Sequence, residues 1–198
     1  MKRVVAIVAS LVIAVSTASA QAPLPERRIG VRFEGASPRV TFHTRDLVDE
    51  GVRRALASGL TKTITVTVQA YNTRRPEPIA TRELTCRITY DLWEEAYVVR
   101  RGRRAETVGR LDEAIDRCVV VTDLLVTTPE QIAPHRGQTI YFAVRAEFDP
   151  ISRARCPRLL RNPAGDDPLG PVVVNIVRRQ ICQAQRSVEF RTPVVTVP

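Results

Sequence analysis

The sequence is poor in the residues that most often carry chemistry: it has two histidines, one methionine and one tryptophan in 198 residues. His43 and His135 lie far apart, and neither belongs to an HExxH or comparable metal-ligand spacing. No GxSxG, glycine-rich phosphate loop or CxxC occurs, so the usual motif arguments for a serine hydrolase, a nucleotide binder or a zinc or redox site do not apply. We therefore expect no catalytic residue, no metal and no cofactor, and we favour a binding protein over an enzyme.

Paired carboxylates are present but in an arrangement that argues against acid–base catalysis. Glu94–Glu95 and Asp166–Asp167 are chain neighbours in predicted polar loops. General acid–base chemistry needs two carboxyl groups several ångströms apart, in environments that separate their pKa values. An envelope hydrolase remains the third reading, and it requires a pocket that joins His43 or His135 to a buried carboxylate.

Long apolar runs are also missing. The longest is Val4–Val15, and a membrane span needs about 20 such residues. The run follows a positively charged start and precedes the small residues 18–20, which is the pattern of a secretory signal peptide. We expect residues 1–20 to be removed after Ala20. The product, residues 21–198, would be a single globular domain without a transmembrane segment, periplasmic or secreted.

Lysine is nearly absent, so the basic character comes from arginine. The formal net charge is +9. A basic surface often indicates nucleic-acid binding, but an exported protein does not meet that partner. Anionic envelope components are the chemically sensible alternative, and a scattered set of solvated arginines is the simpler one.

Periodicity predicts an α+β fold. Alternating apolar residues predict strands, and apolar residues at helical spacing predict helices. The predicted strands are residues 29–42 (a hairpin), 63–70, 84–99 (a hairpin), 139–148 and 187–195. The predicted helices are residues 46–60, 105–124 and 171–184, the second with a β-branched end that favours an earlier stop, and residues 151–170 are an irregular crossing. The expected architecture is an antiparallel sheet of about six or seven strands with two or three helices on one face, closed by a C-terminal helix and strand over 171–198.

Four cysteines in an oxidising compartment indicate two disulfides. Cys86 lies on the apolar face of a predicted strand and Cys118 on the apolar face of the second predicted helix, so these two would meet if that helix covers the sheet. Cys156 and Cys182 would then form the second pair. Three connectivities are possible, and the other two stay open.

The densest basic cluster is RRGRR, formed by Arg100, Arg101, Arg103 and Arg104. We predict that it binds anions, joined by Arg74 and Arg75 if the two loops lie at the same edge of the sheet. The alternative is a solvated charged exit from a hairpin.

Trp93 lies in the predicted turn of the 84–99 hairpin. We expect the indole to fold back over Tyr90 or Tyr97, as aromatic side chains in such turns usually do. If it projects instead, it is a candidate interface anchor.

The order of these segments resembles a known family. The carrying stretches are ALASGLTKTITVTVQ (55–69), ITYDLWEEAYVV (88–99), LDEAI (111–115) and YFAVRAEF (141–148). Over residues 40–148 the chain is similar to an uncharacterised proteobacterial family of exported domains of unknown function. The cysteines and the long C-terminal segment depart from that pattern, and the resemblance implies no catalytic residue.

The leading functional hypothesis is a non-catalytic periplasmic module that binds a protein or envelope partner. The alternative is an anionic-ligand or membrane-surface binder that uses the basic cluster. Nucleic acid is not an expected partner in either case.

Overall fold

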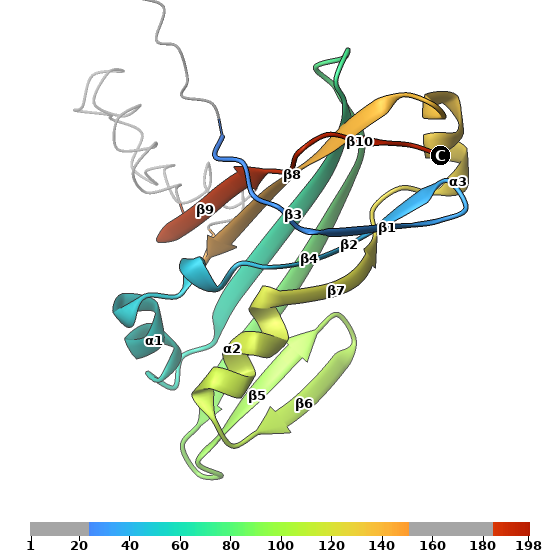
Figure 1. Ribbon diagram of the computed structural model, residues 1–198. Helices are drawn as coiled ribbons and strands as arrows, with labels where there is room; N and C mark the ends of the chain where they lie inside the picture. The colour runs from blue at the N-terminus through green and yellow to red at the C-terminus, as the bar shows by residue number, and fades with distance from the viewer. Residues whose placement is uncertain (1–23, 151–183) are drawn as a thin grey trace, which may run out of the picture.

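The structure is a computed structural model that describes residues 24–150 and 184–198, and these residues form a mainly β domain (Figure 1). The strands are β1 (Gly30–Glu34), β2 (Ser37–His43), β3 (Lys62–Asn72), β4 (Pro78–Asp91), β5 (Ala96–Arg101), β6 (Arg104–Val108), β7 (Val120–Leu125), β8 (Thr139–Phe148), β9 (Arg186–Arg191) and β10 (Val195–Thr196). The helices are η1 (Arg45–Leu47), α1 (Glu50–Leu56), α2 (Leu111–Val119), α3 (Pro129–Ile132) and η2 (Ala133–His135).

The larger of two sheets has seven strands and is antiparallel at every pairing. Its order is β10-β8-β3-β4-β5-β6, and β9 also pairs with β8. The central strand β3 alternates between buried aliphatic residues and half-buried threonines, as the period-two pattern of the sequence predicts. This alternation gives the sheet one covered face and one polar face.

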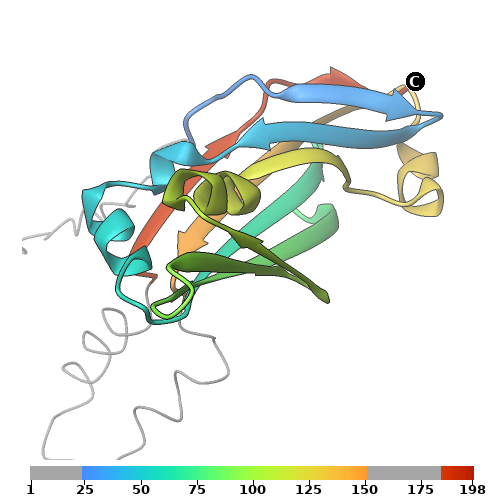
Figure 2. The ribbon, with the colours of Figure 1, turned by 90° about the horizontal axis from the view of Figure 1, so that it is seen from below.

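The covered face packs against a second layer, as Figure 2 shows from below. That layer consists of α2 and a three-stranded sheet of order β1-β2-β7. The core between the layers joins both sheets to the helix, with Phe42 from β2, Phe142 from β8 and Ile115 from α2 in one buried cluster. The expected α+β class, an antiparallel sheet with helices on one face, is confirmed.

The predicted helix 105–124 is wrong at its start, and it stops early at its β-branched end, as the composition of that end favoured. Arg104–Val108 forms β6 because the tight turn at Gly102 and Arg103 returns the chain to pair with β5. The β-branched run after Val119 continues as β7, which pairs with β2. Only the middle of the predicted segment is helical.

The predicted helix 46–60 is shorter than expected. It starts at Glu50 because Asp49, rather than Asp46, is the N-cap: its Oδ1 accepts a hydrogen bond of 2.9 Å from the backbone N–H of Val52. Asp46 lies in the preceding 3-10 turn, and its carboxylate binds Arg27 instead.

The predicted strand 187–195 is divided into β9 and β10, because Pro193 has no backbone N–H to donate to a neighbouring strand. The predicted crossing 151–170 and helix 171–184 lie outside the described residues, apart from Ala184. In the segments that the structure describes, no helix has the length and apolar character of a membrane span.

Candidate functional site: a basic hairpin beside an arginine-lined cleft

The basic cluster of the sequence is the tip of the β5–β6 hairpin, residues 100–104, named here the basic hairpin. Arg101 pairs with Arg104 across the turn, and Gly102 has a φ of 57°. A positive φ at the first central position of a two-residue turn is the geometry that glycine adopts without steric penalty. All four arginine side chains are exposed.

Like charges face one another directly on this hairpin. Arg100 is the register partner of Arg87 on β4, and Arg101 is the register partner of Arg104 on β6. Such cross-strand pairs of like charge are destabilising. Within residues 24–150 and 184–198, none of these four side chains, nor Arg103, forms a salt bridge with a carboxylate. The charge of the basic hairpin is therefore not neutralised by the described part of the chain.

The arginines of the basic hairpin lie on both faces of the large sheet, and the two faces have different surroundings. Arg101 is opposite Cys86, whose side chain is buried beneath α2, so Arg101 lies on the helix side of the sheet. Arg100 and Arg87 lie on the other, polar face. The basic hairpin thus presents arginines on both faces of the sheet.

An open cleft of about 640 Å³ lies between the hairpin and α2. Its lining residues are Arg45, Arg101, Arg110, Asp112, Glu113, Asp116, Arg117, Val120 and Thr122. The carboxylates of this cleft already have partners: Asp116 binds Arg45 at 2.9 Å, Asp112 binds Arg53 at 2.8 Å and Glu113 binds Arg117 at 3.3 Å.

Arg101 and Arg110 are the two cleft arginines without a salt bridge in the described residues. The cleft therefore extends the unneutralised charge of the hairpin onto the helix side of the sheet. Sequence reasoning missed Arg87, which the strand register places opposite Arg100, and Arg110, which lines the same cleft as Arg101 from the start of α2. A strand predicted over residues 104–108, in place of the start of a helix, would have placed β6 beside β5.

Arg74 and Arg75 do not join this site. They lie in the exposed turn between β3 and β4, beyond the register pair Tyr71 and Pro78. The basic hairpin ends level with Cys86, eight residues further along β4. At about 3.3 Å per residue the two basic turns are about 26 Å apart.

The indole of Trp93 projects into solvent instead of folding back, so that expectation is wrong. Trp93 is 96% exposed. Tyr90 and Tyr97 pack against each other with ring centroids 4.8 Å apart, and the burial of Tyr97 raises the pKa of its hydroxyl. The tyrosine pair therefore packs without the indole.

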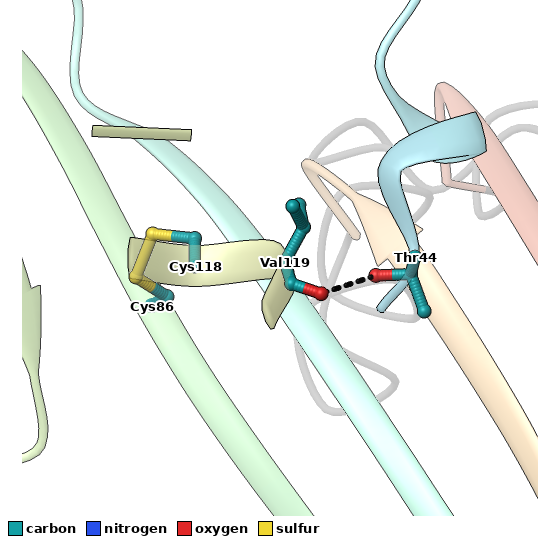
Figure 3. Close-up of a disulfide and its surroundings, with 4 residues drawn as sticks. All are labelled: Thr44, Cys86, Cys118 and Val119. Carbon is teal, nitrogen blue, oxygen red and sulfur yellow. Dashed lines mark hydrogen bonds between the residues drawn. A yellow bond between two sulfur atoms is a disulfide. The ribbon is translucent and has the colours of Figure 1, made fainter. Parts of the chain in front are cut away.

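The predicted disulfide between Cys86 and Cys118 is present and joins β4 to α2 (Figure 3). Both residues are buried. Next to Cys118, the backbone carbonyl of Val119 accepts hydrogen bonds from the backbone N–H of Thr44, at 2.9 Å, and from its hydroxyl, at 3.4 Å. The end of α2 is therefore tied to the large sheet on one side and to the segment after β2 on the other. Cys156 and Cys182 lie outside the described residues.

The condition for a hydrolase is not met around His43. This exposed side chain lines a groove of about 360 Å³, and the carboxylates whose pKa it helps to lower are Asp46 and Asp116. Both are exposed, and hydrogen bonds from Arg27 and Arg45 respectively are the main cause of their lowered pKa values. A carboxylate that is held ionised in this way is a poor proton donor at neutral pH.

His135 has a structural contact. Its Nδ1 lies 3.0 Å from the side-chain amide nitrogen of the buried Asn72. Glu94 and Glu95 are exposed in the turn after β4, and Asp166–Asp167 lie outside the described residues. No group of three or more His, Cys, Asp and Glu side chains in the described segments is placed to bind a metal ion.

Comparison with known proteins identifies a family but no characterised relative. Residues 27–168 match the family described as Domain of unknown function (DUF4390). No curated protein and no solved structure matches the chain.

Proposed function

We propose that this chain, which belongs to the DUF4390 family, is an exported, non-catalytic module that binds a phosphate-bearing component of the cell envelope through its basic hairpin. The observation that carries the proposal is that two pairs of arginines are register partners on neighbouring strands, Arg87 with Arg100 and Arg101 with Arg104, without acidic partners in the described residues. An anion bound between the two arginines of either pair would replace their mutual repulsion with attraction to the anion.

The chemistry of the guanidinium group favours phosphate as the bound anion. Arginine presents planar, paired N–H donors that match two phosphate oxygens at once. Arg101 lies where the hairpin meets the cleft, and Arg110 lines the same cleft. A volume of about 640 Å³ is within the range of small-molecule sites and accommodates a lipid or sugar phosphate headgroup.

Two features support an exported location. The first is the signal-peptide pattern of residues 1–20. The second is the buried disulfide between Cys86 and Cys118, since structural disulfides persist in oxidising compartments. The matching experiment is an intact-mass measurement of the protein recovered from the periplasmic or secreted fraction. We expect a mature chain that starts at Gln21, and a mass that includes residues 1–20 would contradict export by cleavage.

The binding proposal is tested with the mature chain and lipid vesicles. We expect co-sedimentation with vesicles of phosphatidylcholine and phosphatidylglycerol, but not with phosphatidylcholine alone. Binding should weaken when salt rises from about 0.1 M to about 1 M, which shortens the Debye length from about 10 Å to about 3 Å. Equal binding to both vesicle types would reject the proposal.

A matched pair of variants locates the site. Each basic side chain near an anionic surface contributes about 1 kcal/mol, so Arg101→Ala/Arg104→Ala should weaken binding about thirtyfold. Arg74→Ala/Arg75→Ala removes the same charge from the other basic turn and should have a much smaller effect. If the two variants lose affinity equally, net charge rather than the basic hairpin is responsible.

A further inference from the structure

A second exposed surface lies at the end of β5 opposite the basic hairpin. Leu60, Leu92 and Trp93 are 65%, 69% and 96% exposed, and they are three of the five large apolar side chains exposed in the described residues. Leu92 lies over the loop that carries Leu60, because a β-carbon at Gly59 would be 3.6 Å from Leu92 Cδ1. Single exposed apolar residues are ordinary, whereas a local group of them indicates an interaction site. We call these three residues the Trp93 surface.

The Trp93 surface is supported by an ordered turn. Oδ1 of Asp91 accepts hydrogen bonds from the backbone N–H groups of Trp93, at 3.0 Å, and Glu94, at 3.3 Å. The loop before β3 is tied to the same end of β4 by a hydrogen bond of 2.8 Å between the hydroxyls of Thr61 and Thr89. An aromatic side chain on such a turn has few rotatable bonds to immobilise when it binds.

Acidic residues flank Trp93 along the chain. Asp91, Glu94 and Glu95 belong to the same turn, and none of them forms a salt bridge within the described segments. An anionic bilayer would repel them. A protein pocket with an apolar floor and a basic rim complements both the apolar side chains and the charge.

We propose that the Trp93 surface docks into an apolar, basic-rimmed pocket of a partner protein, with the indole as the central anchor. Buried tryptophan anchors are among the largest contributors to protein–protein affinity. The six residues of β5 separate this surface from the basic hairpin by about 17–20 Å at about 3.3 Å per residue. The inference is independent of the anion-binding proposal, and together they describe a module with two binding ends.

The first experiment identifies the partner in cells that express the full-length chain. An aromatic photo-crosslinking amino acid replaces Trp93, so that an aromatic ring remains at the anchor position, and the control carries the same amino acid at Thr107, an exposed residue of β6. We expect one protein to crosslink from position 93 and not from position 107. Equal crosslinking from both positions, or none from position 93, overturns the proposal.

The second experiment measures docking with that purified protein. Trp93 is the single tryptophan of the chain, so incorporation of 5-fluorotryptophan gives one ¹⁹F resonance that reports on this site alone. We expect the resonance to shift when the purified partner is added. It should not shift with phosphatidylglycerol vesicles or when the concentration of the chain itself is raised. A shift with vesicles would show a lipid contact, a shift with chain concentration a second copy, and either result overturns the proposal.

Affinity measurements with the same partner test the roles of the indole and the charge. Trp93→Ala should weaken binding at least tenfold and Trp93→Phe by less, because phenylalanine retains an aromatic anchor. Glu94→Lys/Glu95→Lys should also weaken binding, and its effect should diminish at high salt. The urea midpoint of each variant should equal that of the unmodified chain, since these side chains are exposed. Unchanged affinity in Trp93→Ala contradicts the proposal.

Discussion

At the scale of single residues, arginine has two roles that the sequence does not distinguish. Arg45 binds Asp116 at 2.9 Å, and Arg39 binds Glu34 at 2.6 Å and also Asp123 at 3.2 Å. Such exposed pairs contribute little stability each. The arginines of the basic hairpin have no such partner in the described residues, and this difference marks them as available for an external anion.

Cys86 and Cys118 are the residues whose removal tests the attachment of α2 to the sheet. The bridge spans a sequence separation of 32 residues and restricts the unfolded chain accordingly. We expect Cys86→Ala/Cys118→Ala to lower the free energy of unfolding by about 2–4 kcal/mol. Urea denaturation measures this loss, and peptide mapping without reduction checks that these two cysteines are linked in the unmodified chain. An unchanged urea midpoint would contradict a stabilising role.

At the scale of elements, β3 shows most directly how sequence pattern becomes architecture. Val66, Val68 and Ala70 are fully buried against the second layer, and Thr67 and Gln69 between them lie on the polar face. Adjacent positions of β3 therefore require different side chains: apolar ones on the buried face and polar ones on the other face.

Two isosteric exchanges on β3 test these requirements. Val68→Thr places a hydroxyl where the side chain is fully buried, and we expect it to lower the free energy of unfolding by about 1–3 kcal/mol. Thr67→Val changes the neighbouring, half-buried position on the polar face and should have an effect within about 0.5 kcal/mol. Urea denaturation of both variants gives the comparison. Equal losses would mean that the two faces of the sheet are not distinct.

The ion pairs that link η1 to neighbouring segments predict that acid lowers the stability of the fold. Hydrogen bonds from Arg27 and Arg45 lower the pKa values of Asp46 and Asp116 below 3.8. A carboxylate whose pKa is lower in the folded state stabilises that state above its unfolded pKa and loses this contribution as pH falls through the folded value. We therefore expect the free energy of unfolding to decrease below about pH 4.

Chemical denaturation between pH 7 and pH 2 measures this decrease. The variant Asp46→Asn/Asp116→Asn lacks both titrating groups, so its stability should fall less steeply in the acid range. Parallel curves for the variant and the unmodified chain would show that other carboxylates control the acid response.

At the scale of the whole molecule, the two ends of β5 carry opposite charge and different chemistry. The basic hairpin lies at one end and the Trp93 surface, with its three carboxylates, at the other. The length of β5, about 17–20 Å, separates them, so the proposed partners would bind without competing for the same residues.

This separation predicts independent binding. Mutations at sites more than about 7–10 Å apart that share no partner usually have additive effects. We expect Trp93→Ala to leave vesicle binding unchanged and Arg101→Ala/Arg104→Ala to leave crosslinking from position 93 unchanged. The cosedimentation and crosslinking assays described above measure both. A loss of vesicle binding in Trp93→Ala would indicate one continuous site.

The local pattern of the sequence was sufficient to predict the class of fold and most of the strands. One face of β3 and of β8 is buried, and this alone produces the period-two alternation of apolar and polar residues in their sequences. The local pattern placed Cys86 on the inner face of a strand and Cys118 on the inner face of a helix, but it left three connectivities open, and only the packing of α2 on the large sheet decided for the Cys86–Cys118 bond. The helix predicted over 105–124 is present only over Leu111–Val119, because helical spacing of apolar residues does not exclude extended chain when a neighbouring strand offers hydrogen bonds.

Only the tertiary structure decided which residues form the candidate sites. Arg87 joins the basic hairpin through strand register, and Arg110 lines the cleft through the placement of α2, and both depend on packing between distant segments. Register likewise excluded Arg74 and Arg75. These outcomes depend on distances between segments, which a local sequence pattern does not encode.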